Sequence, residues 1–335
     1  MLAVAAYLVH RLVAAVGWRD LVDRLRDASP AWLLAAAGCV LLHLWLWGYR
    51  WKVAIRRVDA RPRRRVIYAA LAAAASVNLV APFARVLGGL LRARYLARSG
   101  SHSLAAFYGV VLFDQIAHLV VMTALTGAAV VCGLWLLGRD LASMALGLVL
   151  AATLAAFFFW EERLTAHGPQ WIADWLESRS RRHRGLRRSA FARGHETLRM
   201  LAGLLADRGL RFEAAGLGIA LFLASALAQG AVFAALGEHP GALVVAVTVA
   251  LGTAAGTLAG TPGGLGATEA AMIALYVALD VDRLDAAAAA LAYRGVYYAV
   301  VFATGVPSAA ILEWRLGKTV AATDFPRPEA GDEKR

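Results

Sequence analysis

The chain has 335 residues, of which 60% are hydrophobic, and carries a formal net charge of +12 at pH 7. Its mean hydropathy of +0.59 and apolar runs that approach the roughly 20 residues needed to span a bilayer exclude an ordinary soluble domain. Only Cys39 and Cys132 occur, both inside apolar runs, which excludes a disulfide framework and a cysteine-based metal site. The composition predicts an all-α, polytopic membrane helical bundle.

The arginines are concentrated between the apolar runs. Residues 50–65 and a long connection at about 161–213 hold most of them. The neutral or acidic connections are 18–29, 138–140, 237–239 and 280–285. By the positive-inside rule the basic connections are cytoplasmic and the others external. Such loops set topology and meet anionic lipid head groups, so the charge does not indicate a nucleic acid partner.

Six apolar segments are predicted to cross the membrane. In chain order they are 2–17, 31–49, 104–137, 142–160, 214–236 and 286–313. The first contains a basic residue and is predicted to be a short helix rather than a signal peptide. The path gives a multi-pass protein of the cell (inner or plasma) membrane with residues 1–316 as the transmembrane domain. Residues 317–335 are predicted to be a disordered cytoplasmic tail.

Two further apolar segments have both ends on one side of the membrane. Residues 66–91 lie between basic connections and are too few for two full spans, with a break from Asn78 to Pro82. Residues 241–279 lie between external connections. We therefore expect two oppositely oriented re-entrant hairpins, which form an inverted repeat. For residues 241–279, the alternative is a tight cytoplasmic turn between two ordinary spans.

The second of these segments contains GTPGGLGATE (260–269). Proline lacks an N–H group and glycine adopts positive φ, so a helix should end near Gly260 and restart near Gly266. Broken backbone at membrane depth is tolerated only beside protein or a wet cavity. A restarted helix presents unpaired N–H groups and a positive dipole end, which transporters use to hold anionic substrate groups.

Charged residues inside the apolar segments are costly and by default mark function. They are Arg85, Asp114, Glu269 and Arg294, two positive and two negative. Arg92 follows Arg85 by seven residues, so a continuous helix places both on one face, as a track for a phosphate. The alternative for each is a structural ion pair or a side chain that reaches to the interface. His43 and His118 are expected to be packed or hydrogen bonded.

These motifs resemble a known family. TPGGLGATEAAMIALY followed by AALAYRGVYYAV is similar to the PGGLG-x-x-E and YR signature of flippase-like membrane proteins, which comprise the transmembrane region of lysylphosphatidylglycerol synthases and stand-alone relatives. GYRWKV (48–53) and NLVAPFARVLGGLLRARYL (78–96) resemble the same family's upstream elements. The resemblance implies these substrate-binding residues, to which the intramembrane Asp114 is added: Asn78, Pro82, Arg85, Arg92, Pro262, Gly263, Gly264, Gly266, Glu269, Tyr293 and Arg294.

The chain also departs from that family. Gly88 and Gly89 stand where an acidic residue is frequent, and Asp114, Gln115 and His118 stand where an ERLLD pattern is frequent. Ala299 and Val301 replace an aromatic residue and a proline. The soluble transferase domain of the bifunctional members has no counterpart in the short polar tail, so lysylphosphatidylglycerol synthesis by this chain alone is not expected.

The sequence contains no H-E-x-x-H or G-x-S-x-G motif, and GTPGGLG lacks the Lys-Ser/Thr ending of a nucleotide loop. We therefore expect no enzyme activity, no cofactor and no metal site. The expected function is movement of an anionic or aminoacylated phospholipid, or a polyprenyl-phosphate-type lipid, between leaflets. The alternatives are a non-catalytic scaffold for lipid-modifying enzymes or glycosyltransferases, and an integral membrane transferase.

Overall fold

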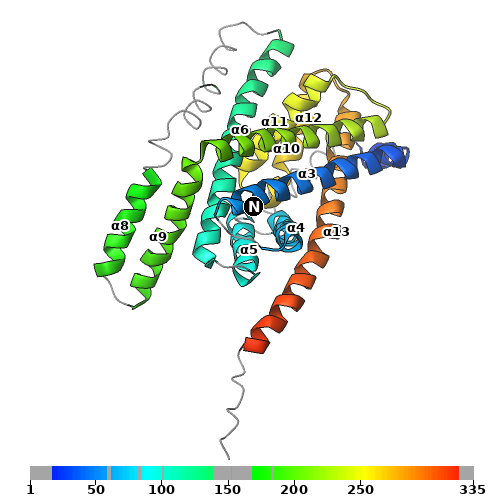
Figure 1. Ribbon diagram of the computed structural model, residues 1–335. Helices are drawn as coiled ribbons and strands as arrows, with labels where there is room; N and C mark the ends of the chain where they lie inside the picture. Colours follow the sequence, from blue (N-terminus) through cyan, green and yellow to red (C-terminus); the bar gives the residue numbers. More distant parts are fainter. Residues whose placement is uncertain are drawn as a thin grey trace, which may run out of the picture.

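The computed structural model describes residues 17–58, 62–80, 84–99, 102–138, 152, 168–182 and 185–323. This part of the chain is helical and contains no strand (Figure 1). The all-α prediction is thereby confirmed. The elements are α2 (Trp18–Arg26), α3 (Pro30–Arg56), α4 (Arg64–Val80), α5 (Ala84–Ser99), α6 (Leu104–Leu136), α8 (Gly168–Arg182), α9 (Gly185–Ala206), α10 (Arg208–Ala235), α11 (Ala242–Ala259), the 3₁₀ turn η2 (Pro262–Gly264), α12 (Ala267–Ala278) and α13 (Arg283–Thr323).

Five described helices are long and apolar enough to cross a membrane. They are α3, α6, α10, α11 and α13, the last over Arg283–Arg315. Four of them cover the predicted segments 31–49, 104–137, 214–236 and 286–313. The predicted segments 2–17 and 142–160 lie outside the described residues, apart from Gly17 and Ala152.

The helix boundaries follow local chemistry. Pro30 stands in the first turn of α3, where its missing N–H group costs nothing. The Ser103 hydroxyl accepts a hydrogen bond from the Ala106 amide at the start of α6, and the Asp207 carboxylate accepts one from the Leu210 amide at the start of α10. Both side chains are N-caps, so α6 and α10 have defined first turns.

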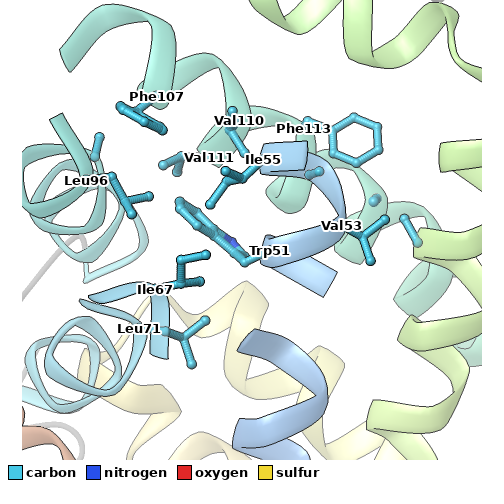
Figure 2. Packing of buried hydrophobic residues seen from close by; sticks show 14 of the residues in the cluster. Trp51, Val53, Ile55, Ile67, Leu71, Leu96, Phe107, Val110, Val111 and Phe113 are labelled. Carbon is cyan, nitrogen blue, oxygen red and sulfur yellow. The ribbon is translucent and has the colours of Figure 1, made fainter. Parts of the chain in front are cut away.

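The transmembrane helices pack around two apolar clusters. One surrounds Trp51 of α3, which lies among Ile67 of α4, Leu96 of α5 and Val111 of α6 (Figure 2). The other surrounds Phe233 of α10 and Tyr276 of α12, whose rings meet edge to face at 4.8 Å. Residues 286–290 of α13 are all alanine and buried in the second cluster. Small side chains let helices approach closely, and such packing drives helix association in lipid.

Polar contacts join the connections into two groups. At one end, Arg24 of α2 donates to Asp285 Oδ1 at 2.6 Å and to Glu238 Oε1 at 3.1 Å. The bond to Asp285 raises the pKa of Arg24 above its ordinary value. We call this the Arg24 end. It unites the predicted external connections 18–29, 237–239 and 280–285.

The second group of contacts lies among the predicted cytoplasmic connections. Arg57 donates to Asp207 at 2.6 Å, and a His102 ring nitrogen lies 2.8 Å from the Val58 carbonyl oxygen. Arg98, at the end of α5, bonds Glu313 of α13 at 3.5 Å. We call this the Arg57 end. The helices α8 and α9, which occupy most of the predicted loop 161–213, also join this end through a Ser103–Glu196 hydrogen bond of 2.6 Å.

Three predicted boundaries differ from the structure in detail. The basic connection 50–65 begins only after Arg56, because α3 continues through Arg50. The helix pair α4 and α5 covers 64–80 and 84–99, more than the apolar segment 66–91. α13 continues to Thr323, past the predicted start of the tail at 317, and residues 324–335 lie outside the described residues.

Candidate functional site

The helix break predicted at the glycine-rich motif is present. α11 ends at Ala259, and Gly260, Gly263, Gly264 and Gly266 all have positive φ, from 59° to 79°. Pro262 opens the 3₁₀ turn between them, and α12 starts at Ala267. A side chain is strained at positive φ, so this turn requires its glycines.

The turn packs tightly against the end of α4. A Cβ atom added at Gly263 would lie 3.2 Å from the Leu79 carbonyl oxygen and 3.3 Å from the Tyr298 hydroxyl. One at Gly264 would lie 2.6 Å from the Thr268 hydroxyl and 3.3 Å from Gly256 Cα. The structure therefore brings the PGG turn, the C-terminal end of α4 and the middle of α13 together.

A buried ion pair joins α12 to α13 at this turn. Arg294 Nε lies 2.5 Å from Glu269 Oε1, and Arg294 Nη2 donates to the Gly263 carbonyl at 2.5 Å. The guanidinium carbon lies 5.1 Å from the centre of the Tyr298 ring. Glu269 is only 1% exposed, and its second carboxylate oxygen has no partner among the described residues. The neighbouring Tyr293 is buried, and its ring centre lies 6.2 Å from that of Tyr297.

The amide groups at the start of α12 are the candidate anion donors. The Gly264 N–H bonds the Thr261 carbonyl and the Leu265 N–H bonds the Pro262 carbonyl, so both are used inside the turn. The first α12 backbone bond runs from Ala270 N–H to the Gly266 carbonyl. The amides of Gly266 to Glu269 precede it, where helix N–H groups lack intrahelical partners. An anion at this helix start would therefore meet amides from Gly266 onward.

Asp114 lies in a second buried cluster, between α3, α5 and α6. Arg50 Nε and Nη2 both lie 2.8 Å from Asp114 Oδ1. Arg92 Nη1 and Trp47 Nε1 donate to Oδ2 at 3.3 and 3.0 Å. The Arg92 guanidinium also lies 4.6 Å from the Trp51 ring centre and 5.1 Å from that of Trp47. All three charged residues are buried, so the cluster places two guanidinium groups on one carboxylate.

Several donors of this cluster have no acceptor in the described part of the chain. They are Arg50 Nη1, Arg92 Nε and Trp51 Nε1. Arg50 and Trp47 are residues that sequence reasoning missed, because Arg50 was assigned to the basic connection. Their signal was the GYRWKV segment, which continues the helical pattern of the preceding apolar run.

The remaining predicted residues lie around the α4–α5 junction. The Asn78 side-chain oxygen is buried without a described partner and contacts the position where Gly88 would carry a Cβ. A Cβ at Gly89 would lie 2.8 Å from Val111 of α6, so the two glycines let α5 pack closely against α4 and α6. Pro82 lies outside the described residues. Arg85 lies in the first turn of α5, where the structure describes its backbone but not its side chain. Its role therefore stays a prediction.

Comparison with known proteins supports the resemblance found in the sequence. A family model described as the lysylphosphatidylglycerol synthase TM region matches residues 1–305. A UPF0104 membrane protein of Methanothermobacter thermautotrophicus is 24% identical over 319 residues, which cover 91% of this chain and 93% of the relative. The range matched by the family model spans the residues of the broken helix, the Glu269–Arg294 pair and the Asp114 cluster. The chain therefore belongs to the family of the lysylphosphatidylglycerol synthase transmembrane region.

Proposed function

We propose that this membrane protein is a non-catalytic lipid flippase. It moves an anionic or aminoacylated phospholipid, or a polyprenyl-phosphate-type lipid, between leaflets of the cell membrane. The observation that carries the proposal is the break between α11 and α12, which places a helix start next to the Glu269–Arg294 pair inside the bundle. A helix start and an arginine are the groups that bind the phosphate of a head group, whereas the lipid tails need no binding groups in a bilayer.

The proposed path uses two opposed helix hairpins. We propose that α4 with α5 enters from the cytoplasmic side and that α11 with α12 enters from the external side. The contact between Gly263 and Leu79 supports this arrangement, because it joins the break of one pair to the C-terminal end of the first helix of the other. α12 has 12 residues and is roughly 18 Å long, too short for a hydrocarbon core of about 30 Å.

The head group is held and released by exchange of charged partners. Its phosphate binds Arg85 and the α12 amides from Gly266 onward. Arg294 then exchanges Glu269 for the head group as the cavity changes its open side. Such a charge-assisted contact is worth about 1.5–3 kcal/mol, so one contact can replace the other at little net cost.

Without an energy source, this exchange equilibrates the leaflets. A net flux then follows a gradient made by other enzymes or by protons that bind Glu269. The proposed partners are accordingly the lipid and a lipid-modifying enzyme or glycosyltransferase that makes or consumes it.

The test is a vesicle assay with the purified, reconstituted chain. Fluorescent phosphatidylglycerol in the inner leaflet is protected from external dithionite until it is moved. Wild type should expose it faster than empty vesicles. Arg85→Ala should abolish the movement because the phosphate loses its cation. Glu269→Gln should slow it because Arg294 loses its charged partner, while lipid binding is kept.

A surface carboxylate provides the matched control. Glu313→Gln changes an exposed carboxylate that bonds Arg98 at 3.5 Å, away from the helix start and the Glu269–Arg294 pair, and it should move lipid like wild type. If wild type moves neither phosphatidylglycerol nor a polyprenyl phosphate faster than empty vesicles, the proposal is wrong. Full activity of Arg85→Ala would remove the proposed phosphate contact.

A further inference from the structure

One face of α8 carries large exposed apolar side chains. One of them, Trp175, also meets the Phe191 ring of α9 edge to face, with 6.4 Å between the ring centres. Trp171 is 71% exposed, Ile172 43% and Trp175 44%. Trp175 follows Trp171 by four residues and Ile172 by three, spacings that place neighbouring side chains on one stripe of a helix. The opposite side of α8 packs on α9, where Leu176 contacts Gly194 and Ala173 is buried. In Figure 1, α9 lies between α8 and α6.

Two hydrogen bonds fix the level of this stripe relative to a membrane-crossing helix. The His195 ring nitrogen of α9 lies 2.8 Å from the Ala173 carbonyl oxygen of α8. The Thr197 hydroxyl, two residues further along α9, donates to the Ala105 carbonyl at 2.8 Å. Ala105 is the second residue of α6, one of the helices long and apolar enough to cross a membrane. Through α9, the stripe is therefore tied to the first turn of α6.

Positive charge follows the aromatic residues toward the tip of the α8–α9 pair. Arg179 lies one turn beyond Trp175, with its guanidinium carbon 5.1 Å from the ring centre. Residues 168–206 contain eight arginines and only three acidic residues. An aromatic and apolar band next to the hydrocarbon, with cations beyond it, is the order in which side chains meet a head-group layer.

We propose that the α8 face, defined as Trp171, Ile172, Trp175 and Arg179, binds the anionic head-group region of the bilayer that α6 crosses. The occupant is a phospholipid surface rather than a soluble partner. The contacts of α9 with α6 hold the tryptophan rings of the α8 face at the membrane boundary, and Arg179 complements a lipid phosphate. This site is separate from the proposed transport site and does not depend on lipid translocation.

The experiment compares dye positions on the whole chain. Cys39 and Cys132 are replaced by alanine, and single cysteines are introduced as Ile172→Cys and, near the tip, Ser189→Cys. Each is labelled with a polarity-sensitive dye and reconstituted in phosphatidylcholine vesicles with or without phosphatidylglycerol. The dye at 172 should emit at shorter wavelength than the dye at 189, and nitroxide-labelled lipid should quench it more. The shift should be larger with phosphatidylglycerol.

Two variants separate the aromatic from the electrostatic contribution. Trp171→Ser, at a mostly exposed ring, should reduce the quenching at 172 without loss of folded protein in size-exclusion chromatography. Arg179→Gln should weaken the dependence on phosphatidylglycerol, and 1 M salt, which shortens the screening length to about 3 Å, should remove it. Equal emission and quenching at 172 and 189 in both vesicle types would overturn the proposal and favour a soluble partner. Insertion that is the same with neutral lipid and with Arg179→Gln would overturn its anionic specificity.

Discussion

At the scale of single residues, Asp114 holds two guanidinium groups in the apolar interior. Arg50 and Arg92 each bond a different oxygen of its carboxylate, and Trp47 supplies a further donor. A charge buried without a partner is far more costly than a paired one. The carboxylate is thus the residue on which the positions of α3, α5 and α6 relative to one another depend.

Asp114→Asn should therefore destabilise the fold strongly. It leaves two neighbouring guanidinium groups without a carboxylate, and loss of one partner of a buried pair costs about 3–5 kcal/mol. Arg92→Gln should cost less, because Arg50 and Asp114 remain as a neutral pair. Asp285→Asn at the Arg24 end should cost about 1 kcal/mol or less, since Glu238 still accepts from Arg24. Thermal unfolding in detergent ranks the three; equal losses for Asp114→Asn and Arg92→Gln would contradict this account.

The sequence identified most charges of the two clusters and the Glu269–Arg294 pair, but not the partners of Asp114. Arg85, Asp114, Glu269 and Arg294 stood out because each interrupts an apolar run. Helical periodicity gives the face of a residue on its own helix, but it gives no distance to another helix. Arg50 is 64 positions from Asp114, and its position next to a basic connection hid its burial. The pairing required the three-dimensional packing of α3, α5 and α6.

At the scale of elements, glycines determine how closely helices approach. Gly256 of α11 faces the start of α12, and a Cβ there would collide with the Thr268 hydroxyl and lie 3.4 Å from Gly264 Cα. Gly216 of α10 has no atom outside its own helical backbone within 4 Å of its Cβ position. These two helical glycines are chemically alike but differ in their surroundings.

Gly256→Ala should destabilise the α11–α12 pair. The added methyl group must displace Thr268 or separate the helices, which costs about 1–3 kcal/mol. Gly216→Ala should be neutral or slightly stabilising, because alanine is the better helix former by roughly 0.5–1 kcal/mol. Differential unfolding in the same detergent measures both. A Gly256→Ala protein as stable as Gly216→Ala would show that α11 and α12 are not held at this distance.

The sequence predicted the break in this element well because its causes are local. Proline and four glycines within seven residues determine where α11 ends and α12 begins. The predicted pair of opposed hairpins implied that the two breaks approach each other, but it did not identify the contact of the turn with Leu79. The predicted segment was shorter than α4 and α5 together. Hydropathy ends a segment at its arginines, whereas the helices continue through them.

At the scale of the whole molecule, the connections form the two ends described above. Arg24, Glu238 and Asp285 bring together three predicted external segments, and Arg57, Asp207 and Val58 belong to predicted cytoplasmic ones. The arginine distribution thus predicted the grouping, since segments on the same side of a membrane are free to contact one another. It predicted none of the individual partners, which depend on how the helices cross.

The orientation and both hairpins can be tested together by the side from which cysteines react. In the Cys39→Ala/Cys132→Ala chain, Arg63→Cys stands just before α4 and Arg94→Cys in the C-terminal half of α5, while His239→Cys and Arg283→Cys flank α11 and α12. All four positions are exposed. In intact cells, an impermeant maleimide should label residues 239 and 283 but reach 63 and 94 only after lysis, because both members of each pair share a side. Labelling of 63 and 94 from opposite sides would make α4–α5 a membrane crossing, and opposite labelling of 239 and 283 would do the same for α11–α12. Either result would remove the inverted repeat on which the proposed lipid path depends.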